Sequence, residues 1–123
     1  MQHIMVIDDE RDVLAYLDAA LTVEGYRVTG VVSGAEAIDL MQADAPDIVI
    51  LDLRMPDMNG IEILHAIRKS YPDMPVIVCS ALRSYKRDFE IISGNVAAFF
   101  EKPIDFDRLS EVIEQQIGAP GVT

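Results

Sequence analysis

Acidic residues and one lysine follow the short apolar runs of this chain, at the points where buried strands would end. Asp8 and Asp9 follow the first run, Asp52 the third, Ser80 the fourth and Lys102 the fifth. Parallel strands bring their carboxyl ends to one edge of a sheet, where ligands of such sheets bind. We therefore expect these five side chains to share one small hollow.

Several carboxylates in one hollow need a cation. Two carboxylates ~4 Å apart repel by roughly 4 kcal/mol at an effective dielectric of 20, more than Lys102 alone would comfortably offset for a group of three. Mg2+ binds carboxylates, backbone carbonyls, waters and phosphate oxygens in an octahedral shell. The residues thus predict a Mg2+ site, in which the adjacent Asp8 and Asp9 are suited to hold the metal.

The same residues predict phosphoryl transfer. With a metal bound, an accessible carboxylate becomes a nucleophile toward phosphorus, and Asp52, alone at the tip of the most apolar run, is the candidate. Ser80 can donate a hydrogen bond to a phosphoryl oxygen, and Lys102 can pair with another. This chemistry needs no general base.

The elements that must position these groups alternate between short apolar runs and stretches of helical period. That pattern is typical of a parallel sheet with crossover helices, most simply a flavodoxin-like α/β doubly wound sheet of about five strands in the order 2-1-3-4-5 with about five helices. The expected strands are Ile4–Ile7, Tyr26–Val32, Asp47–Leu51, Val76–Cys79 and Ala97–Phe100.

Capping residues mark the ends of the expected helices. Gly25 ends the first helix, Ser33 caps the second, and Asp105 caps the last. A fourth helix is expected between Ser84 and Gly94. We expect one domain over residues 1–118, with 119–123 a flexible tail or the start of a linker.

Bulk composition excludes several function classes. A formal net charge of -11 over 123 residues would repel nucleic acid, so no direct nucleic-acid binding is expected. No apolar stretch approaches the ~18 residues that span a bilayer, so no membrane association is expected. The single cysteine, Cys79, lies in an apolar run and fits a reducing, cytoplasmic setting.

Four motifs, in this order, resemble the response-regulator receiver family of two-component signalling, and the resemblance covers Ile4 to Ile117. The motifs are Ile7-Asp8-Asp9-Glu10, Leu51-Asp52-Leu53-Arg54-Met55-Pro56 with Asn59-Gly60, Val78-Cys79-Ser80-Ala81, and Phe100-Glu101-Lys102-Pro103.

The resemblance implies a division of labour at the site. Asp52 would be the phosphorylation site, and Mg2+ would be bound by Asp8, Asp9, Asp52 and the backbone carbonyl of Arg54, with Asp9 a direct ligand. The phosphoryl donor would be a phospho-histidine on a sensor histidine kinase or phosphotransfer protein.

The resemblance also implies a conformational switch. Ser80 and Lys102 would bind the phosphoryl group, and Phe99 would occupy the aromatic switch position, without the hydroxyl of the commoner Tyr. The Lys102-Pro103 bond would be cis. The signal would pass to an output domain or protein that the sequence does not identify. Arg54 and Leu82 fall at positions with which the family tunes the lifetime of the phosphoryl group. The resemblance therefore predicts no lifetime for this chain.

Rival functions are a flavin-phosphate carrier, a phosphate-ester hydrolase of the haloacid dehalogenase type, and a degenerate receiver used only for docking. Asp8 and Asp9 would repel a flavin phosphate, and Arg54 stands where the hydrolase has its second aspartate. Singly, the acidic run could be only a helix N-terminus, and Lys102 only a surface ion-pair partner. Their joint placement at strand ends favours a site.

Overall fold

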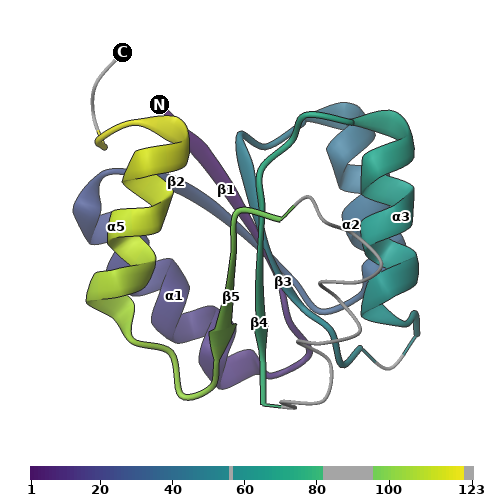
Figure 1. Cartoon of the computed structure of the whole chain (residues 1–123), viewed down its shortest axis with the longest axis horizontal. Coiled ribbons are helices and arrows are strands. Elements are labelled where there is room, and N and C mark those ends of the chain that lie inside the picture. Colours follow the sequence, from purple (N-terminus) through teal and green to yellow (C-terminus); the bar gives the residue numbers. More distant parts are fainter. Residues whose placement is uncertain (56, 82–95, 121–123) are drawn as a thin grey trace.

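A single sheet of five parallel strands forms the centre of the molecule (Figure 1). The computed structural model describes residues 1–55, 57–81 and 96–120. The strand order is β2-β1-β3-β4-β5, which confirms the predicted doubly wound topology. The strands are β1 (His3–Ile7), β2 (Arg27–Val31), β3 (Ile48–Asp52), β4 (Val76–Ser80) and β5 (Ala98–Glu101).

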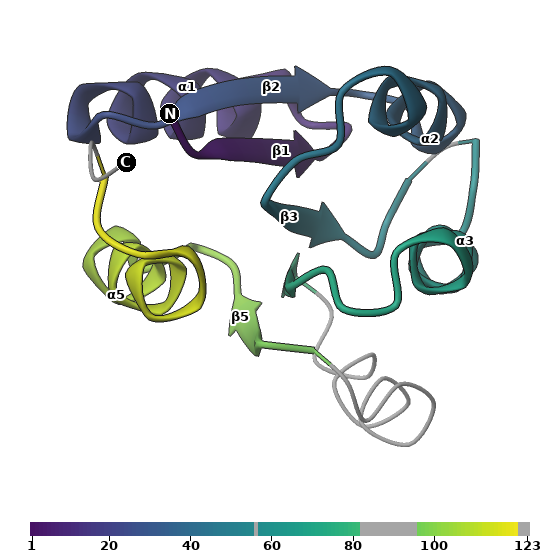
Figure 2. The same cartoon turned by 90° about the horizontal axis from the view of Figure 1, so that it is seen from above.

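Helices cover both faces of this sheet. In Figures 1 and 2, α1 and α5 lie on one face and α2 and α3 on the other. The helices are α1 (Arg11–Glu24), α2 (Gly34–Ala43), α3 (Gly60–Ser70) and α5 (Phe106–Ile117). The fourth helix predicted between Ser84 and Gly94 lies outside the described residues.

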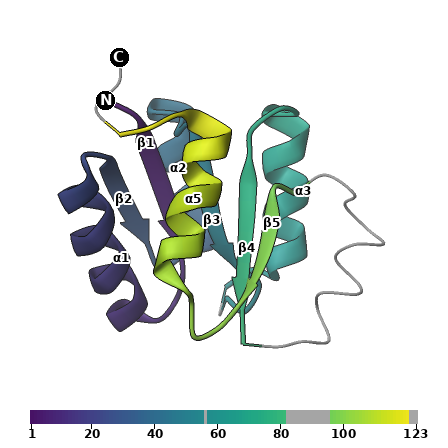
Figure 3. The ribbon, with the colours of Figure 1, turned by 60° about the vertical axis from the view of Figure 1, so that its left-hand side comes forward.

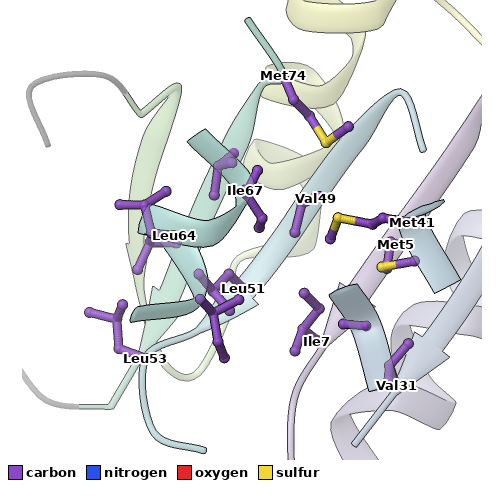
Figure 4. Close-up of a cluster of buried hydrophobic side chains, with 14 residues drawn as sticks. Met5, Ile7, Val31, Met41, Val49, Leu51, Leu53, Leu64, Ile67 and Met74 are labelled. Carbon is purple, nitrogen blue, oxygen red and sulfur yellow. The ribbon is translucent and has the colours of Figure 1, made fainter. Parts of the chain in front are cut away.

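The central strands β1, β3 and β4 are buried along their whole length because each face of the sheet packs against helices. Alternate residues of one strand therefore enter different cores: Met5 and Ile7 point toward α2 and α3, whereas Ile4 and Val6 point toward α1 and α5. Figure 4 shows the first core, in which Leu51 of β3 lies near Leu64 of α3. Two packed faces fix the register of the central strands, and with it the position of the residues at their ends.

The predicted helix caps are confirmed. Gly25 has a φ of 110° after α1, Ser33 Oγ accepts a hydrogen bond from the backbone N–H of Glu36 at 3.2 Å, and Asp105 accepts one from that of Arg108 at 3.3 Å. Tyr26 does not begin β2 as expected. Its backbone N–H completes the end of α1 by donating to the carbonyl of Leu21 at 3.1 Å.

The connection from β3 to α3 is closed tightly on itself. The backbone N–H of Gly60 donates to the carbonyl of Leu53 at 3.1 Å. A Cβ on Gly60 would lie 2.4 Å from the Cα of Leu53, a distance that real side chains do not tolerate. Only glycine therefore lets α3 begin so close to the end of β3, beside the residues that follow Asp52.

Figure 3 views the sheet from the side of α1 and α5, with the end of α5 beside the start of β1. The Tyr26 hydroxyl donates to the carbonyl of Gly118 at 3.3 Å, and the Gln2 amide donates to that of Ala119 at 2.7 Å. These bonds fasten the end of α5 to the edge opposite the candidate site. Within the described part of the chain, no helix has the length and apolar character needed to cross a membrane.

Candidate functional site

The ammonium of Lys102 is the centre of a charged cluster at the carboxyl edge of the sheet. Its Nζ lies 2.9 Å from Asp8 Oδ2, 2.9 Å from Asp52 Oδ2 and 2.8 Å from Glu10 Oε1. The side chains of Asp8 and Asp52 are each 4% exposed, whereas that of Glu10 is 58% exposed. The lysine thus joins two buried carboxylates and one that faces solvent.

Strand pairing places these groups together. Asp52 is the last residue of β3, which pairs with β1 and β4. The backbone N–H of Asp8 continues the β1–β2 ladder by donating to the carbonyl of Val31 at 3.0 Å. The backbone N–H of Lys102 likewise donates to the carbonyl of Ser80 at 3.0 Å. The side chains at the ends of β1, β3 and β5 therefore meet in the hollow that the sequence predicts.

The cluster changes the proton affinity of its members. Burial raises the pKa of Asp8 to about 6, although hydrogen bonds from the Glu10 backbone N–H and from Lys102 oppose this rise. The hydrogen bond from Lys102 lowers the pKa of Glu10. Burial alone would lower the pKa of Lys102, but its bonds to Glu10, Asp52 and Asp8 hold it above its ordinary value. The lysine therefore remains charged, and Asp8 is the carboxyl group whose charged form is disfavoured by its surroundings.

Asp52 is both anchored and open to a cavity. Its Oδ1 accepts a hydrogen bond from the backbone N–H of Arg54 at 3.0 Å, and its Oδ2 is bound to Lys102. A cavity of about 200 Å³ is lined by Asp9, Glu10, Asp52, Arg54, Ala81 and Lys102. An incoming group of the size of a phosphate can therefore meet this carboxylate beside the ammonium.

The carboxylates fit a hard divalent cation. One oxygen from each of Asp8, Asp9, Glu10 and Asp52 can be chosen so that all four lie within 4.8 Å of one another. Oxygen ligands from carboxylates suit Mg2+, and a single ammonium leaves excess negative charge for it to neutralise. The three predicted carboxylate ligands are thus brought together, while a ligand role for the carbonyl of Arg54 stays a prediction.

The two residues predicted to respond to the phosphoryl group lie on neighbouring strands. Ser80 ends β4, is fully buried and pairs with Glu101 of β5. Phe99 pairs with Val78 and packs, partly buried, against the core between the sheet and α2 and α3. Ser80 lies at the end of the fourth strand and Phe99 in the fifth, as the sequence predicts, but Ser80 is not among the described residues that line the cavity, and the roles of both stay predictions. The Lys102-Pro103 peptide bond is cis, as expected.

Sequence reasoning missed the roles of two further carboxylates. Glu10 stood in the acidic motif, but no pattern indicated that it would reach Lys102, 92 positions away. Asp57, in the connection between β3 and α3, accepts hydrogen bonds from the backbone N–H groups of Gly34 and Ala35 at 3.1 Å each and from the Ser33 hydroxyl at 2.9 Å. It thereby ties the connection that carries Arg54 to the N-terminus of α2.

Comparisons of the sequence and of the structure with known proteins identify the same family. The family model for the response regulator receiver domain matches residues 4–114. Among solved structures, the response regulator protein TrrA from Thermotoga maritima, in complex with Mg2+-BeF, has a TM-score of 0.86 and 32% identity over 95% of this chain and 100% of its own. The described structure and the sequence therefore point to the same fold family.

Curated relatives are longer proteins. The transcriptional regulatory protein GlrR of Escherichia coli (strain K12) is 36% identical over 94% of this chain and 26% of its own length. The luminescence regulatory protein LuxO of Vibrio campbellii is 35% identical over 91% of this chain and 25% of its own. The chain thus spans about a quarter of the length of these relatives. The chain belongs to the response regulator receiver domain family of two-component systems.

Proposed function

We propose that this chain accepts a phosphoryl group on Asp52, with Mg2+ bound beside it, and signals through the resulting change of shape. The observation that carries the proposal is the surrounding of Asp52: a buried carboxylate that opens onto a cavity of about 200 Å³ and lies 2.9 Å from the ammonium of Lys102. The receiver family supports a phosphoacceptor role for the domain.

Asp52 suits the nucleophile better than Asp8 does. Asp52 lines the cavity and is the last residue of the central strand β3. Asp8 is not among the described residues that line this cavity, and burial raises its pKa to about 6. Asp8 is therefore less accessible to an incoming phosphoryl group and is better suited to a metal that keeps it charged.

The donor is a phospho-histidine of a sensor histidine kinase or of a phosphotransfer protein. An oxygen of Asp52 attacks phosphorus, the P–N bond breaks, and its electron pair leaves with the ring nitrogen. An imidazole already protonated on its other nitrogen departs as the neutral ring. The product is an acyl phosphate, and the charges on its oxygens face Lys102 and the hydroxyl of Ser80.

The metal would be held by Asp8, Asp9, Asp52 and the carbonyl of Arg54. When bound, Mg2+ would neutralise negative charge on the carboxylates and on the incoming phosphoryl oxygens. The structure of TrrA, which is 32% identical over 95% of this chain, is a complex with Mg2+-BeF and supports the presence of a Mg2+ site here. Residues of this chain already fix two of these carboxylates in place. Lys102 binds both Asp8 and Asp52, and the backbone N–H of Arg54 also donates a hydrogen bond to Asp52.

The output of the domain is a shape change near β4 and β5. Ser80 and Phe99 belong to adjacent strands, so a movement of the Ser80 hydroxyl toward a phosphoryl group alters the packing beside the Phe99 ring. An output domain or a separate protein reads this change. Longer relatives such as GlrR and LuxO support an output of the first kind, because the chain covers only about a quarter of them.

Incubation with acetyl phosphate and Mg2+ tests the proposal. Intact mass spectrometry should show one added phosphoryl group that hydroxylamine removes, and a chelator should prevent its addition. Asp52→Asn should lose the label, whereas Asp57→Asn, an equal change of charge five residues along the same connection, should keep it. Equal labelling of wild type and Asp52→Asn would remove Asp52 as the acceptor.

A further inference from the structure

The ammonium of Lys102 has no spare donor. A lysine ammonium carries three N–H groups and no acceptor, and three carboxylates lie within hydrogen-bond distance of it: Asp8 at 2.9 Å, Asp52 at 2.9 Å and Glu10 at 2.8 Å. A phosphoryl oxygen can bind this ammonium only if one of the three carboxylates gives up its bond.

The three carboxylates differ in what they would lose. Asp8 and Asp52 are 4% exposed, and each has its other oxygen fixed by a backbone N–H, from Glu10 at 2.9 Å and from Arg54 at 3.0 Å. Removing the ammonium from Asp8, or from Asp52 before its bond to phosphorus forms, would leave a buried charge without its partner. The Glu10 side chain is 58% exposed, so water can replace the ammonium there.

The charge of an arriving phosphoryl group acts in the same direction. Glu10 lines the cavity onto which Asp52 opens, and its carboxylate can lie within 4.8 Å of those of Asp8, Asp9 and Asp52. A phosphoryl group in this cavity therefore repels Glu10 while it attracts Lys102. The exposed carboxylate can swing into solvent, whereas the two buried ones have no such path.

We propose that Glu10 occupies the phosphoryl-binding donor of Lys102 in the unphosphorylated domain and is displaced when a phosphoryl group reaches Asp52. This inference rests on the proposed function and adds to it a residue that competes with the phosphoryl group for the lysine. Phosphorylation then includes an exchange of anions on Lys102, in which no covalent bond to Glu10 forms or breaks. Removal of the Glu10 carboxylate should favour the phosphorylated state.

Beryllofluoride, a mimic of the bound phosphoryl group, measures this competition in the whole chain at saturating Mg2+. Glu10→Gln and Glu10→Ala should bind it about threefold to fivefold more tightly than wild type, the range that an exposed ion pair allows. Asp12→Asn is the matched control, because Asp12 is an exposed acid in the first turn of α1, two residues from Glu10. Among the described residues, Lys102 forms ion pairs with Asp8, Glu10 and Asp52 and not with Asp12.

Labelling by acetyl phosphate separates the failure of this inference from that of the proposed function. If wild type takes no phosphoryl group on Asp52, the proposed function fails. If wild type is labelled but Glu10→Gln and Asp12→Asn gain equally, the gain is a general effect of charge and the exchange on Lys102 is overturned. Weaker beryllofluoride binding by Glu10→Gln at saturating Mg2+ would also overturn it, because Glu10 would then assist binding.

Discussion

Carboxylates lie at two places on the carboxyl side of this sheet, and their charges are stabilised in opposite ways. Around Lys102, Asp8, Glu10 and Asp52 share one ammonium. At the start of α2, Asp57 alone accepts three hydrogen bonds, two of them from backbone N–H groups. The three carboxylates around Lys102 carry more negative charge than one ammonium balances. The single carboxylate of Asp57, in contrast, has three hydrogen-bond donors.

The pKa values report this difference. Burial raises the pKa of Asp8 to about 6, whereas hydrogen bonds from Ala35, Gly34 and Ser33 lower that of Asp57. A carboxylate held for structure is stabilised by its surroundings in the charged form, and one held for a ligand is not. Removing a negative charge should therefore stabilise the metal-free domain at the first site and destabilise it at the second.

The largest expected effect is that of Asp8→Asn, and it depends on pH. The folded-state pKa of Asp8, about 6, lies above its unfolded value near 3.8, so the folded state binds more protons between these values and wild type loses stability as pH rises through that window. The variant has no such loss. Urea unfolding in chelator should show Asp8→Asn more stable than wild type at pH 7, with a difference that shrinks toward pH 4. A difference that is constant with pH would contradict the comparison.

Asp9→Asn should give the next effect. Asp9 is exposed, so relief of its repulsion is screened and should raise the metal-free free energy of unfolding by about 1 kcal/mol, roughly 4 °C in Tm. Mg2+ should raise the Tm of wild type, because it binds the folded state, and should raise that of the variant much less. Thermal melts with Mg2+ and with chelator measure both effects. A lower metal-free Tm for Asp9→Asn would make it a structural residue like Asp57.

The smallest expected effect lies at the start of α2. Ser33→Ala removes the cap of the helix and the hydroxyl that donates a hydrogen bond to Asp57, and should lower the free energy of unfolding by about 0.5 kcal/mol. Asp57→Ala should also lower the Tm, which is opposite in sign to the effect of Asp9→Asn. Mg2+ should raise the Tm of both variants as much as that of wild type and so leave the difference from wild type unchanged, because neither residue is a proposed ligand. A rise in Tm for Asp57→Ala would remove the contrast between the two sites.

The sequence predicts the meeting of Asp8, Asp52 and Lys102 because strand ends can be read from apolar runs, and parallel strands end at one edge. Strand limits are set by hydrogen bonding as well as by hydrophobicity, which is why Tyr26 belongs to the end of α1 rather than to β2. The bonds of Glu10 to Lys102 depend on side-chain rotamers between residues 92 positions apart. Such contacts have no periodic signal.

The contacts of Asp57 escaped prediction for a related reason. Ser33 identifies the N-terminus of α2 through its own local pattern. The acceptor for the backbone N–H of Gly34 is Asp57, which lies 23 positions away in a different connection. Only the tight closure of that connection, at Leu53 and Gly60, brings it to the helix. Turn chemistry predicts where a chain bends and leaves open which distant backbone groups the bend will meet.

The one cysteine of the chain gives the site a built-in chemical reporter. Cys79 is 1% exposed, and it lies directly across the β3–β4 ladder from Asp52. Burial raises the pKa of its thiol to about 12, so almost no thiolate forms at neutral pH in the closed sheet. A thiol reagent can react only after the core between the sheet and α1 and α5, in which Cys79 is buried, opens locally. The rate of modification therefore measures how often this core opens beside the candidate site, without any introduced label.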